Sequence, residues 1–152
     1  MKYFTCTFNS PIGPMIATAD DNAITALDFI DHPCVIETSV HPLLLQLENE
    51  LSDYFEGKRT SFTLPLNPEG TPFQKSVWKT LLTIPYGDTI SYAEEAKMLG
   101  NHKATRAVAN ANGKNPIAIL IPCHRVIATG GGLGGYSGGI EKKEFLLALE
   151  KK

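Results

Sequence analysis

The stretch Asn67-Pro68-Glu69-Gly70 divides the chain into two halves of opposite charge. Residues 1–70 hold three basic against ten acidic side chains, a net charge of −7, and residues 71–152 hold eleven basic against six acidic ones, a net charge of +5. Proline and glycine interrupt regular structure, and the charge changes sign at the same point. The sequence therefore predicts two small domains, 1–70 and 71–152, of which the second binds a polyanion.

The first half alternates polar and apolar residues in short runs, which is typical of strands. Tyr3–Phe8 and Met15–Ala19 flank a turn-rich segment and predict a hairpin, and Ile24–Ile30 predicts a third strand. Leucine and aromatic residues at helical spacing predict a helix over His41–Gly57, and Phe62–Leu66 is predicted to be a short extended piece. We expect a small α/β domain here.

The second half is predicted to be mainly helical. Thr71 before Pro72 fits the start of one helix, and Ser91 with Glu94 fits a capping box at the start of another. Two short helices on either side of Gly100-Asn101-His102 form a helix-turn-helix candidate. The predicted helices are 72–84, 92–100, 103–111 and 141–152. Together with the first half, this pattern gives a mixed α+β fold.

The motif Pro122-Cys123-His124-Arg125-Val126 follows the apolar run Ile117–Ile121. A thiol beside imidazole and guanidinium groups on an exposed turn is placed to become a thiolate, which is the nucleophile, if a neighbouring base lowers its pKa or takes its proton. Consecutive side chains in an extended segment point apart, so we expect His124 to act on Cys123 through a bridging water. The alternatives are a buried structural cysteine and, for Arg125, either a local hydrogen-bond network or a DNA contact.

A nucleophile and its base need a third group that orients the base. The C-terminal helix offers Glu141, Glu144 and Glu150, and spacing alone does not choose among them. Arg106 poses a similar choice, because small residues surround it on its predicted helix. Such a helix can approach DNA closely or pack on a core with the arginine at the surface, and composition alone favours the second.

Four further segments accompany the cysteine motif in the order and spacing of the O6-alkylguanine-DNA alkyltransferases, and the chain resembles that family over residues 71–150. They are Ile90-Ser91-Tyr92, Arg106-Ala107-Val108, Asn115-Pro116 and Lys143-Glu144-Phe145-Leu146-Leu147. The resemblance implies a ribonuclease H-like domain followed by a winged-helix-like DNA-binding domain. It also implies irreversible transfer of an alkyl group from O6-alkylguanine in double-stranded DNA to the protein's own cysteine, in one turnover, by a monomer without a cofactor. Whether O4-alkylthymine is also a substrate stays open.

The same resemblance implies roles for individual residues. The implied catalytic residues are Cys123, His124, Glu150 and Asn115, with Glu150 accepting from the histidine and Asn115 bracing the turn. A base must leave the duplex before its substituted oxygen can meet a thiol. The implied DNA contacts, made through the minor groove, are Tyr92, Asn101, Arg106 and Thr129, with Arg106 replacing the flipped nucleotide. The implied base pocket is Val126, Tyr136, Ser137 and Gly138.

Two positions depart from the common family pattern. Ala109 stands where glycine is usual, and His102 stands where proline is frequent, so the approach to DNA stays open in detail. The glycine-rich loop 130–139 lacks the Gly-Lys-Ser/Thr ending of a phosphate-binding loop, so nucleotide binding is not expected.

The cysteines and histidines of the first half raise the question of a metal. Cys6, His32, Cys34 and His41 could be assembled into a zinc site, but they lack the tight ligand spacing of zinc modules, so no metal is expected. Three cysteines, and no apolar signal segment after Lys2, indicate a reducing intracellular compartment: the cytoplasm, or the nucleus in a eukaryote.

Two other functions stay open on the same scaffold. The first is a lesion-binding protein without catalysis, and such relatives replace the nucleophilic cysteine, commonly with tryptophan, so that Cys123 argues against it. The second is a thiol hydrolase that uses Cys123 and His124. A hydrolase turns over repeatedly, whereas an alkyltransferase stops after one equivalent.

Overall fold

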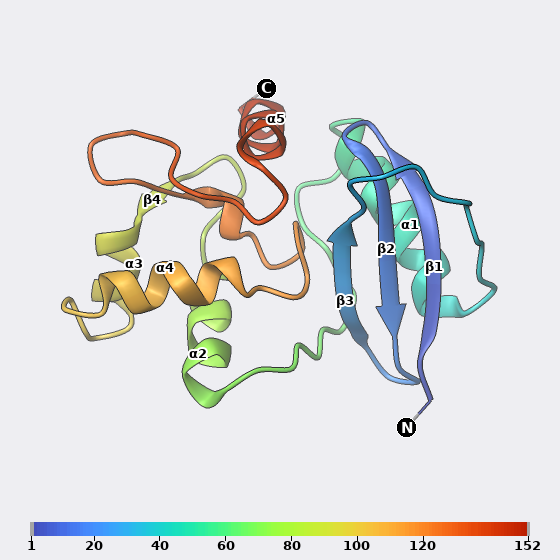
Figure 1. Cartoon of the computed structure of the whole chain (residues 1–152), viewed down its shortest axis with the longest axis horizontal. Coiled ribbons are helices and arrows are strands. Elements are labelled where there is room, and N and C mark those ends of the chain that lie inside the picture. Colours follow the sequence, from blue (N-terminus) through green and yellow to red (C-terminus); the bar gives the residue numbers. More distant parts are fainter. Residues whose placement is uncertain (1, 152) are drawn as a thin grey trace. The chain divides into compact units, whose positions relative to one another are not determined.

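The computed structural model describes residues 2–151, and the chain forms two compact units (Figure 1). The first consists of Met1–Glu69 with Pro116–Ala118, and the second of Gly70–Asn115 with Ile119–Lys152. Helices and strands occur in both units, which confirms the mixed α+β class expected from the sequence. Every helix among the described residues is too short or too polar to span a membrane.

The first unit is a three-stranded antiparallel sheet with one helix packed against it. Its elements are β1 (Phe4–Ser10), β2 (Gly13–Ala19), β3 (Ile24–Phe29) and α1 (Pro42–Phe55). Cys6 pairs with Ala17, and Ala17 pairs with Leu27, so one buried row crosses all three strands. Side chains alternate between the faces of a strand, and this row forms the core together with the apolar stripe of α1. The buried residues of that stripe are Leu44, Leu47, Leu51 and Tyr54.

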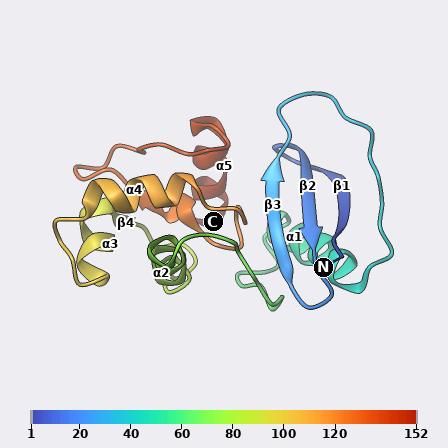
Figure 2. The same cartoon turned by 60° about the horizontal axis from the view of Figure 1, so that its bottom comes forward.

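Other segments of the unit cover both edges of this sheet. The long connection 30–41 between β3 and α1 is traced in Figure 2, and it bonds to β1 through the Thr7 amide, which donates to the Glu37 carbonyl at 2.8 Å. At the β3 edge, Leu66 and Ile117 each form an isolated parallel bridge. Residues 116–118, distant in sequence, thus complete the first unit. A covered edge cannot recruit another strand.

The second unit contains four α-helices, a short 3-10 helix and two very short strands. Its elements are α2 (Pro72–Leu81), β4 (Ile90–Ser91), α3 (Tyr92–Met98), α4 (Thr105–Gly113), the 3-10 helix η1 (Cys123–Arg125), β5 (Val126–Ile127) and α5 (Ile140–Glu150). Capping boxes begin α2 at Thr71 and α3 at Ser91. These boxes satisfy amides that the first turn of a helix leaves unpaired, which explains why both helices begin where the sequence predicts.

Some boundaries differ from the sequence prediction. Helix α4 begins at Thr105 rather than at Lys103 and continues to Gly113, and α5 ends at Glu150, while the predicted last residue Lys152 lies outside the described residues. The parallel pair of β4 and β5 was not predicted. Strands of two residues contain too few positions to show alternation, so their sequence gives no signal.

Trp78 joins α2 to α4 in the core of the second unit. Its side chain is 1% exposed, and its indole N–H donates to the Ala111 carbonyl at 2.8 Å. The unit also accommodates Trp78 by having Gly70 beside it, since a Cβ at that position would lie 2.5 Å from the ring. Trp78 therefore fixes the position of α4.

We expect Trp78→Phe to lower the free energy of unfolding by about 1–3 kcal/mol, because it removes the indole donor and leaves unfilled volume. Urea unfolding followed by circular dichroism measures this change. Phe73→Leu on the same helix is the control, since Phe73 is 42% exposed and its substitution should change stability by less than about 0.5 kcal/mol. Equal losses of stability from the two substitutions would contradict the role of Trp78 in holding α4 in place.

Candidate active site

Cys123 begins a buried turn of 3-10 helix. The side chain is 6% exposed, and the Arg125 amide donates to the Pro122 carbonyl at 3.0 Å to close the turn. The expectation of an exposed, extended segment is wrong, because the apolar residues 119–121 that lead into the motif are buried and the turn that follows them is buried as well. A 3-10 turn of three residues still gives Cys123 and His124 different directions.

Asn115 braces this turn from the segment after α4. Its side-chain amide donates to the Ile121 carbonyl at 2.8 Å and to the Cys123 sulfur at 3.3 Å. One amide thus holds the backbone before the cysteine and contacts the thiol itself. A hydrogen bond donated to sulfur favours its charged form.

Glu150 is the acid that meets His124. The imidazole Nε2 donates to Glu150 Oε2 at 2.7 Å, whereas Glu141 and Glu144 are exposed. Arg125 grips the same carboxylate, because its Nε donates to Oε1 at 2.8 Å and its Nη2 donates to Oε2 at 3.1 Å. Arg125 also donates to the Ile84 carbonyl at 2.8 Å. Of the two interpretations of Arg125, the structure shows the local network.

These contacts determine the protonation of His124. A carboxylate held by Arg125 is an acceptor only, so Nε2 carries the imidazole proton and Nδ1 presents a lone pair. Nδ1 is buried and has no hydrogen-bond partner among residues 2–151. Burial lowers the pKa of His124 and outweighs the opposite effect of Glu150, so the ring is neutral. A neutral imidazole with a free Nδ1 lone pair can accept a proton.

The Cys123 thiol is neutral in the free protein. Burial raises its pKa to about 11, although the Asn115 hydrogen bond and the charge of Lys143 act in the opposite direction. The desolvation of a buried anion thus outweighs the neighbouring donors, and of the two routes to a thiolate this favours removal of the proton by a base over a lowered pKa. A base must remove the thiol proton before attack.

Lys143 is a buried cation, and the sequence pattern indicates it only as part of a family segment. Its Nζ donates to the Val126 carbonyl at 2.6 Å and to the Gly135 carbonyl at 3.1 Å, and it forms no salt bridge within residues 2–151. Burial lowers its pKa to about 8. A signal for it exists in α5, where Lys143, Leu146, Leu147 and Glu150 occupy one apolar stripe at helical spacing.

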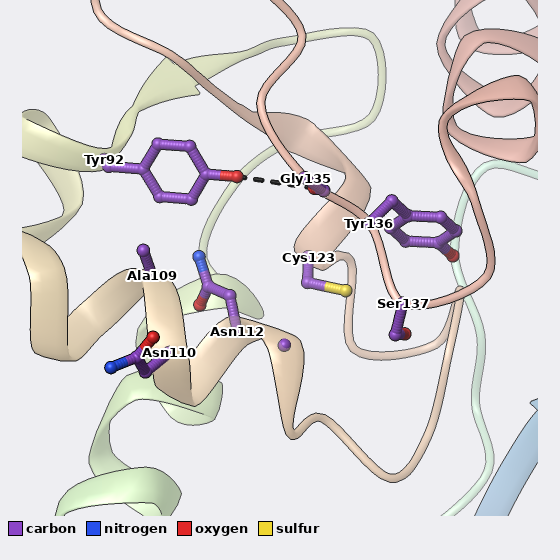
Figure 3. A pocket seen from close by; sticks show the side chains of 9 residues that line it. Tyr92, Ala109, Asn110, Asn112, Cys123, Gly135, Tyr136 and Ser137 are labelled. Carbon is purple, nitrogen blue, oxygen red and sulfur yellow. Dashed lines mark hydrogen bonds between the residues drawn. The ribbon is translucent and has the colours of Figure 1, made fainter.

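Cys123 opens into a pocket of about 350 Å³ (Figure 3). The pocket is lined by Tyr92, Ala109, Asn110, Asn112, Gly113, Cys123, Gly135, Tyr136 and Ser137. The Tyr92 hydroxyl donates to the Gly135 carbonyl at 3.4 Å and so joins α3 to the glycine-rich loop. Gly134 has a φ of 73°, and a Cβ there would lie 2.7 Å from the Tyr92 hydroxyl, so both conformation and space require glycine.

The structure brings together only some of the predicted site residues. Tyr92, Cys123, Tyr136 and Ser137 line the pocket, whereas Val126 and Gly138 are absent from its lining, and the Val126 carbonyl already accepts from Lys143. The predicted DNA contacts Asn101, Arg106 and Thr129 are exposed and lie outside the lining. Residues from α4 that form one wall were not predicted, and they are Ala109, Asn110, Asn112 and Gly113.

The residues considered for zinc do not form a metal site. Within residues 2–151 no group of three or more histidine, cysteine, aspartate or glutamate side chains is arranged to hold a metal ion. Cys6 is buried in β1, His32 is exposed in the 30–41 connection, and His41 caps α1 by accepting from the Leu43 amide.

A raised thiol pKa predicts slow labelling of Cys123. Because its pKa lies at about 11, its rate with iodoacetamide should rise about tenfold per pH unit from pH 7 to pH 10. Mass spectrometry of peptides follows this labelling at each pH. Cys34, which is half-buried, serves as the internal control for reagent and digestion. A Cys123 rate that levels off by pH 8 would show a thiol that ionises readily and contradict the assignment.

Comparisons with known proteins match this architecture over the whole chain. The family model of the 6-O-methylguanine DNA methyltransferase ribonuclease-like domain matches residues 2–68, and that of the DNA binding domain of the same methyltransferase matches residues 72–152. Among curated relatives, methylated-DNA–protein-cysteine methyltransferases of Methanosarcina acetivorans and Bacillus subtilis are 47% and 41% identical. These alignments cover 94% and 99% of this chain and 95% and 96% of the relatives.

Solved structures show the same fold. An O6-methylguanine methyltransferase of Mycobacterium tuberculosis has a TM-score of 0.89 and 42% identity, over 99% of this chain and 93% of the other. A second structure, M. tuberculosis OGT in complex with DNA, has a TM-score of 0.87 and 45% identity, over 97% of this chain and 92% of the other. The resemblance found in the sequence is confirmed, and the chain belongs to the 6-O-methylguanine DNA methyltransferase family.

Proposed function

We propose that this protein repairs DNA by moving the alkyl group of O6-alkylguanine irreversibly to Cys123. The observation that carries the proposal is a thiol in the wall of a base-sized pocket, on the same 3-10 turn as the histidine that Glu150 holds. The relatives named methylated-DNA–protein-cysteine methyltransferases support this class of reaction. The substrate we assign is O6-alkylguanine in duplex DNA, and the acting form is a monomer inside the cell.

The second unit supplies the means to hold a flipped base. Its pocket of about 350 Å³ falls within the range of small-molecule sites, and a single base must leave the duplex to enter it. Arg106 is exposed on α4 beside Ala107, so the helix can approach a groove closely with one long cationic side chain projecting. We assign Arg106 to the gap left by the flipped nucleotide and Asn101 and Thr129 to the backbone.

The division at residue 70 separates two roles. We assign DNA binding and chemistry to residues 71–152, which carry the positive net charge, the pocket and Cys123. Residues 1–70 carry negative net charge, which disfavours contact with phosphates.

The proton of Cys123 leaves through His124. With a thiol pKa of about 11 and a neutral imidazole, a water bridging to Nδ1 is the route we assign for its removal. The resulting imidazolium stays paired with Glu150. Lys143 forms no salt bridge within the described chain, and its positive charge favours the thiolate. A base and a cation therefore both favour formation of the thiolate.

Alkyl transfer is a displacement at carbon. The thiolate forms a new S–C bond, the bond from carbon to O6 breaks, and its electron pair goes to the guanine. The departing guanine takes a proton, for which we assign the Tyr92 hydroxyl as donor, and the imidazolium proton returns to the tyrosinate. The balance is thiol plus alkylguanine giving thioether plus guanine. The thioether C–S bond is not cleaved and no thiol remains on Cys123, so the molecule acts once.

The competing functions differ in stoichiometry. A lesion-binding protein would leave Cys123 unmodified, and a thiol hydrolase would release product repeatedly. The presence of a thiol in the pocket lining argues against the first, and the family argues against the second.

Incubation with DNA that contains O6-methylguanine should add the mass of one methyl group to Cys123 and should stop at one equivalent. Intact-protein and peptide mass spectrometry measure both quantities. Cys123→Ala is expected to abolish the gain completely, because it removes the nucleophile. Cys34→Ala is the matched control and should leave the gain unchanged. Methylation that survives Cys123→Ala would end the proposal.

Arg106→Ala should slow methyl transfer from duplex DNA about tenfold or more, because flipping a base costs a few kcal/mol that a filled gap offsets. Its reaction with free O6-benzylguanine should change by less than about twofold, since no base is flipped. Lys114→Ala, which removes one exposed positive charge just after α4, controls for general attraction to phosphate. Equal losses of Arg106→Ala on both substrates would remove the assigned role.

A further inference from the structure

Glu95 and Asn112 form a buried polar pair between α3 and α4. Glu95 is 0% exposed and Asn112 is 5% exposed. The Asn112 side-chain amide donates to Glu95 Oε1 at 2.7 Å. Neither residue belongs to the thiol–imidazole–carboxylate arrangement, but Asn112 lines the pocket into which Cys123 opens (Figure 3). A carboxyl group buried next to the pocket is costly unless it is paired or protonated.

The one hydrogen bond between Glu95 and Asn112 leaves two buried oxygen atoms of the pair without a donor. Glu95 Oε2 and Asn112 Oδ1 are both buried and have no partner among residues 2–151. If Glu95 is a carboxylate, both atoms are acceptors and each is left unsatisfied in the interior. One proton on Oε2 turns that atom into a donor, and Oδ1 is the unsatisfied acceptor on the amide that already bonds to Oε1. A protonated acid and a primary amide can pair through two hydrogen bonds, which would satisfy both buried oxygens.

No charged neighbour compensates an ionised Glu95. It forms no salt bridge within the described residues, and the short strands β4 and β5, which also pack on α3, contain no titratable side chain. The other charged residues of α2, α3 and α4 are all exposed, and they are Lys75, Lys79, Glu94, Lys97 and Arg106. Burial raises the pKa of Glu95 to about 7, against the smaller effect of Asn112. The titratable groups that respond to its charge are Tyr92 and Cys123.

The pair lies where a charge affects the reaction. Helix α3 begins at Tyr92, and α4 supplies the pocket wall that includes Asn112. A negative charge on Glu95 raises the pKa of both Cys123 and Tyr92. It therefore opposes the thiolate that alkyl transfer needs, and it repels a second anion in the same interior.

We propose that protonated Glu95 and Asn112 are a positioning pair for alkyl transfer, which fastens α3 to α4 behind the pocket and keeps a second negative charge away from Cys123. The role in transfer rests on the proposed function. Loss of the Glu95 proton removes one hydrogen bond and adds the opposing charge. Alkyl transfer thus depends on a carboxyl group that touches neither the substrate nor the thiol.

Glu95→Gln separates the charge from the shape, because a carboxamide keeps both hydrogen bonds to Asn112 and cannot ionise. The rate of methyl transfer from O6-methylguanine DNA is measured for both proteins between pH 5.5 and pH 9. The ratio of the Glu95→Gln rate to the unmodified rate should stay near one in acid and rise several-fold along a one-proton curve centred near pH 7. Glu94→Gln, on an exposed neighbour whose capping role glutamine preserves, should give a flat ratio. A flat ratio for Glu95→Gln would overturn the role in transfer.

Urea unfolding tests the pair without DNA. A carboxyl whose pKa is raised in the folded state binds its proton more tightly there, so stability falls as pH rises from the ordinary value of 4.5 to about 7 and is constant above it. Relative to Glu95→Gln, the unfolding equilibrium constant of the unmodified protein should therefore increase about a hundredfold between pH 4.5 and pH 8. A ratio of the two unfolding equilibrium constants that does not change with pH would show that Glu95 is not protonated in the folded protein and would overturn the proposed pair.

The two proposals fail in different ways. If the unmodified protein transfers no methyl group at any pH, the proposed function fails, while unfolding still decides whether Glu95 is protonated. If Glu95→Gln does not fold, the carboxyl carbon of Glu95 can be titrated directly by ¹³C NMR in the unmodified protein. A midpoint near pH 7 supports the pair, and a midpoint near 4.5 overturns it.

Discussion

The Glu150 carboxylate holds the reactive turn in place. It is 1% exposed, and it accepts from His124 on η1 and from the forked Arg125 guanidinium beside it. One buried anion thus neutralises one buried cation and fixes the orientation of one imidazole. An unpaired buried charge costs several kcal/mol. Loss of Glu150 would therefore leave the buried Arg125 guanidinium without its carboxylate partner and would free the His124 ring. The end of α5 and the 3-10 turn are therefore one electrostatic unit.

The remaining charges explain how a reactive thiol persists in a folded protein. Cys123 is neutral at ordinary pH because burial outweighs the Asn115 hydrogen bond and the Lys143 charge. The ammonium of Lys143 is held by two carbonyl groups rather than by a carboxylate, so its charge stays available to a thiolate that forms later. In our proposal, a protonated Glu95 adds no negative charge that would oppose the thiolate. In the free protein the thiol and the imidazole are therefore uncharged, and Lys143 keeps its charge without a carboxylate partner among the described residues.

Local sequence patterns predict most of the helices and strands. The features that they do not predict depend on contacts between residues far apart in the sequence. The hairpin followed from a turn between alternating segments, and the Ser10–Gly13 pairing closes it. The capping boxes at Thr71 and Ser91 followed from residues three positions apart. Burial of Cys123 and the β4–β5 pair depend on residues far away in sequence, which periodicity does not report.

Local patterns also do not predict which side chains meet at the site. Spacing left three acids for His124, and only the family resemblance indicated Glu150, which the structure brings to 2.7 Å. The sequence does not predict the burial of Lys143 and Glu95, because charged residues are expected at a surface. Their burial depends on backbone carbonyls that accept from Lys143 and on a side-chain amide that donates to Glu95, all from other parts of the chain. Polar residues inside an apolar stripe are the signal that could have found them.

The mechanism depends on the protonation state of His124, which we assign as a neutral imidazole with its proton on Nε2 and a lone pair on the buried Nδ1. Two-bond ¹H–¹⁵N NMR of the imidazole at neutral pH measures it directly, because the two tautomers and the imidazolium give different nitrogen shifts. We expect a protonated Nε2 bound to Glu150 and an unprotonated Nδ1. A proton on Nδ1, in the other tautomer or in an imidazolium, would contradict the account.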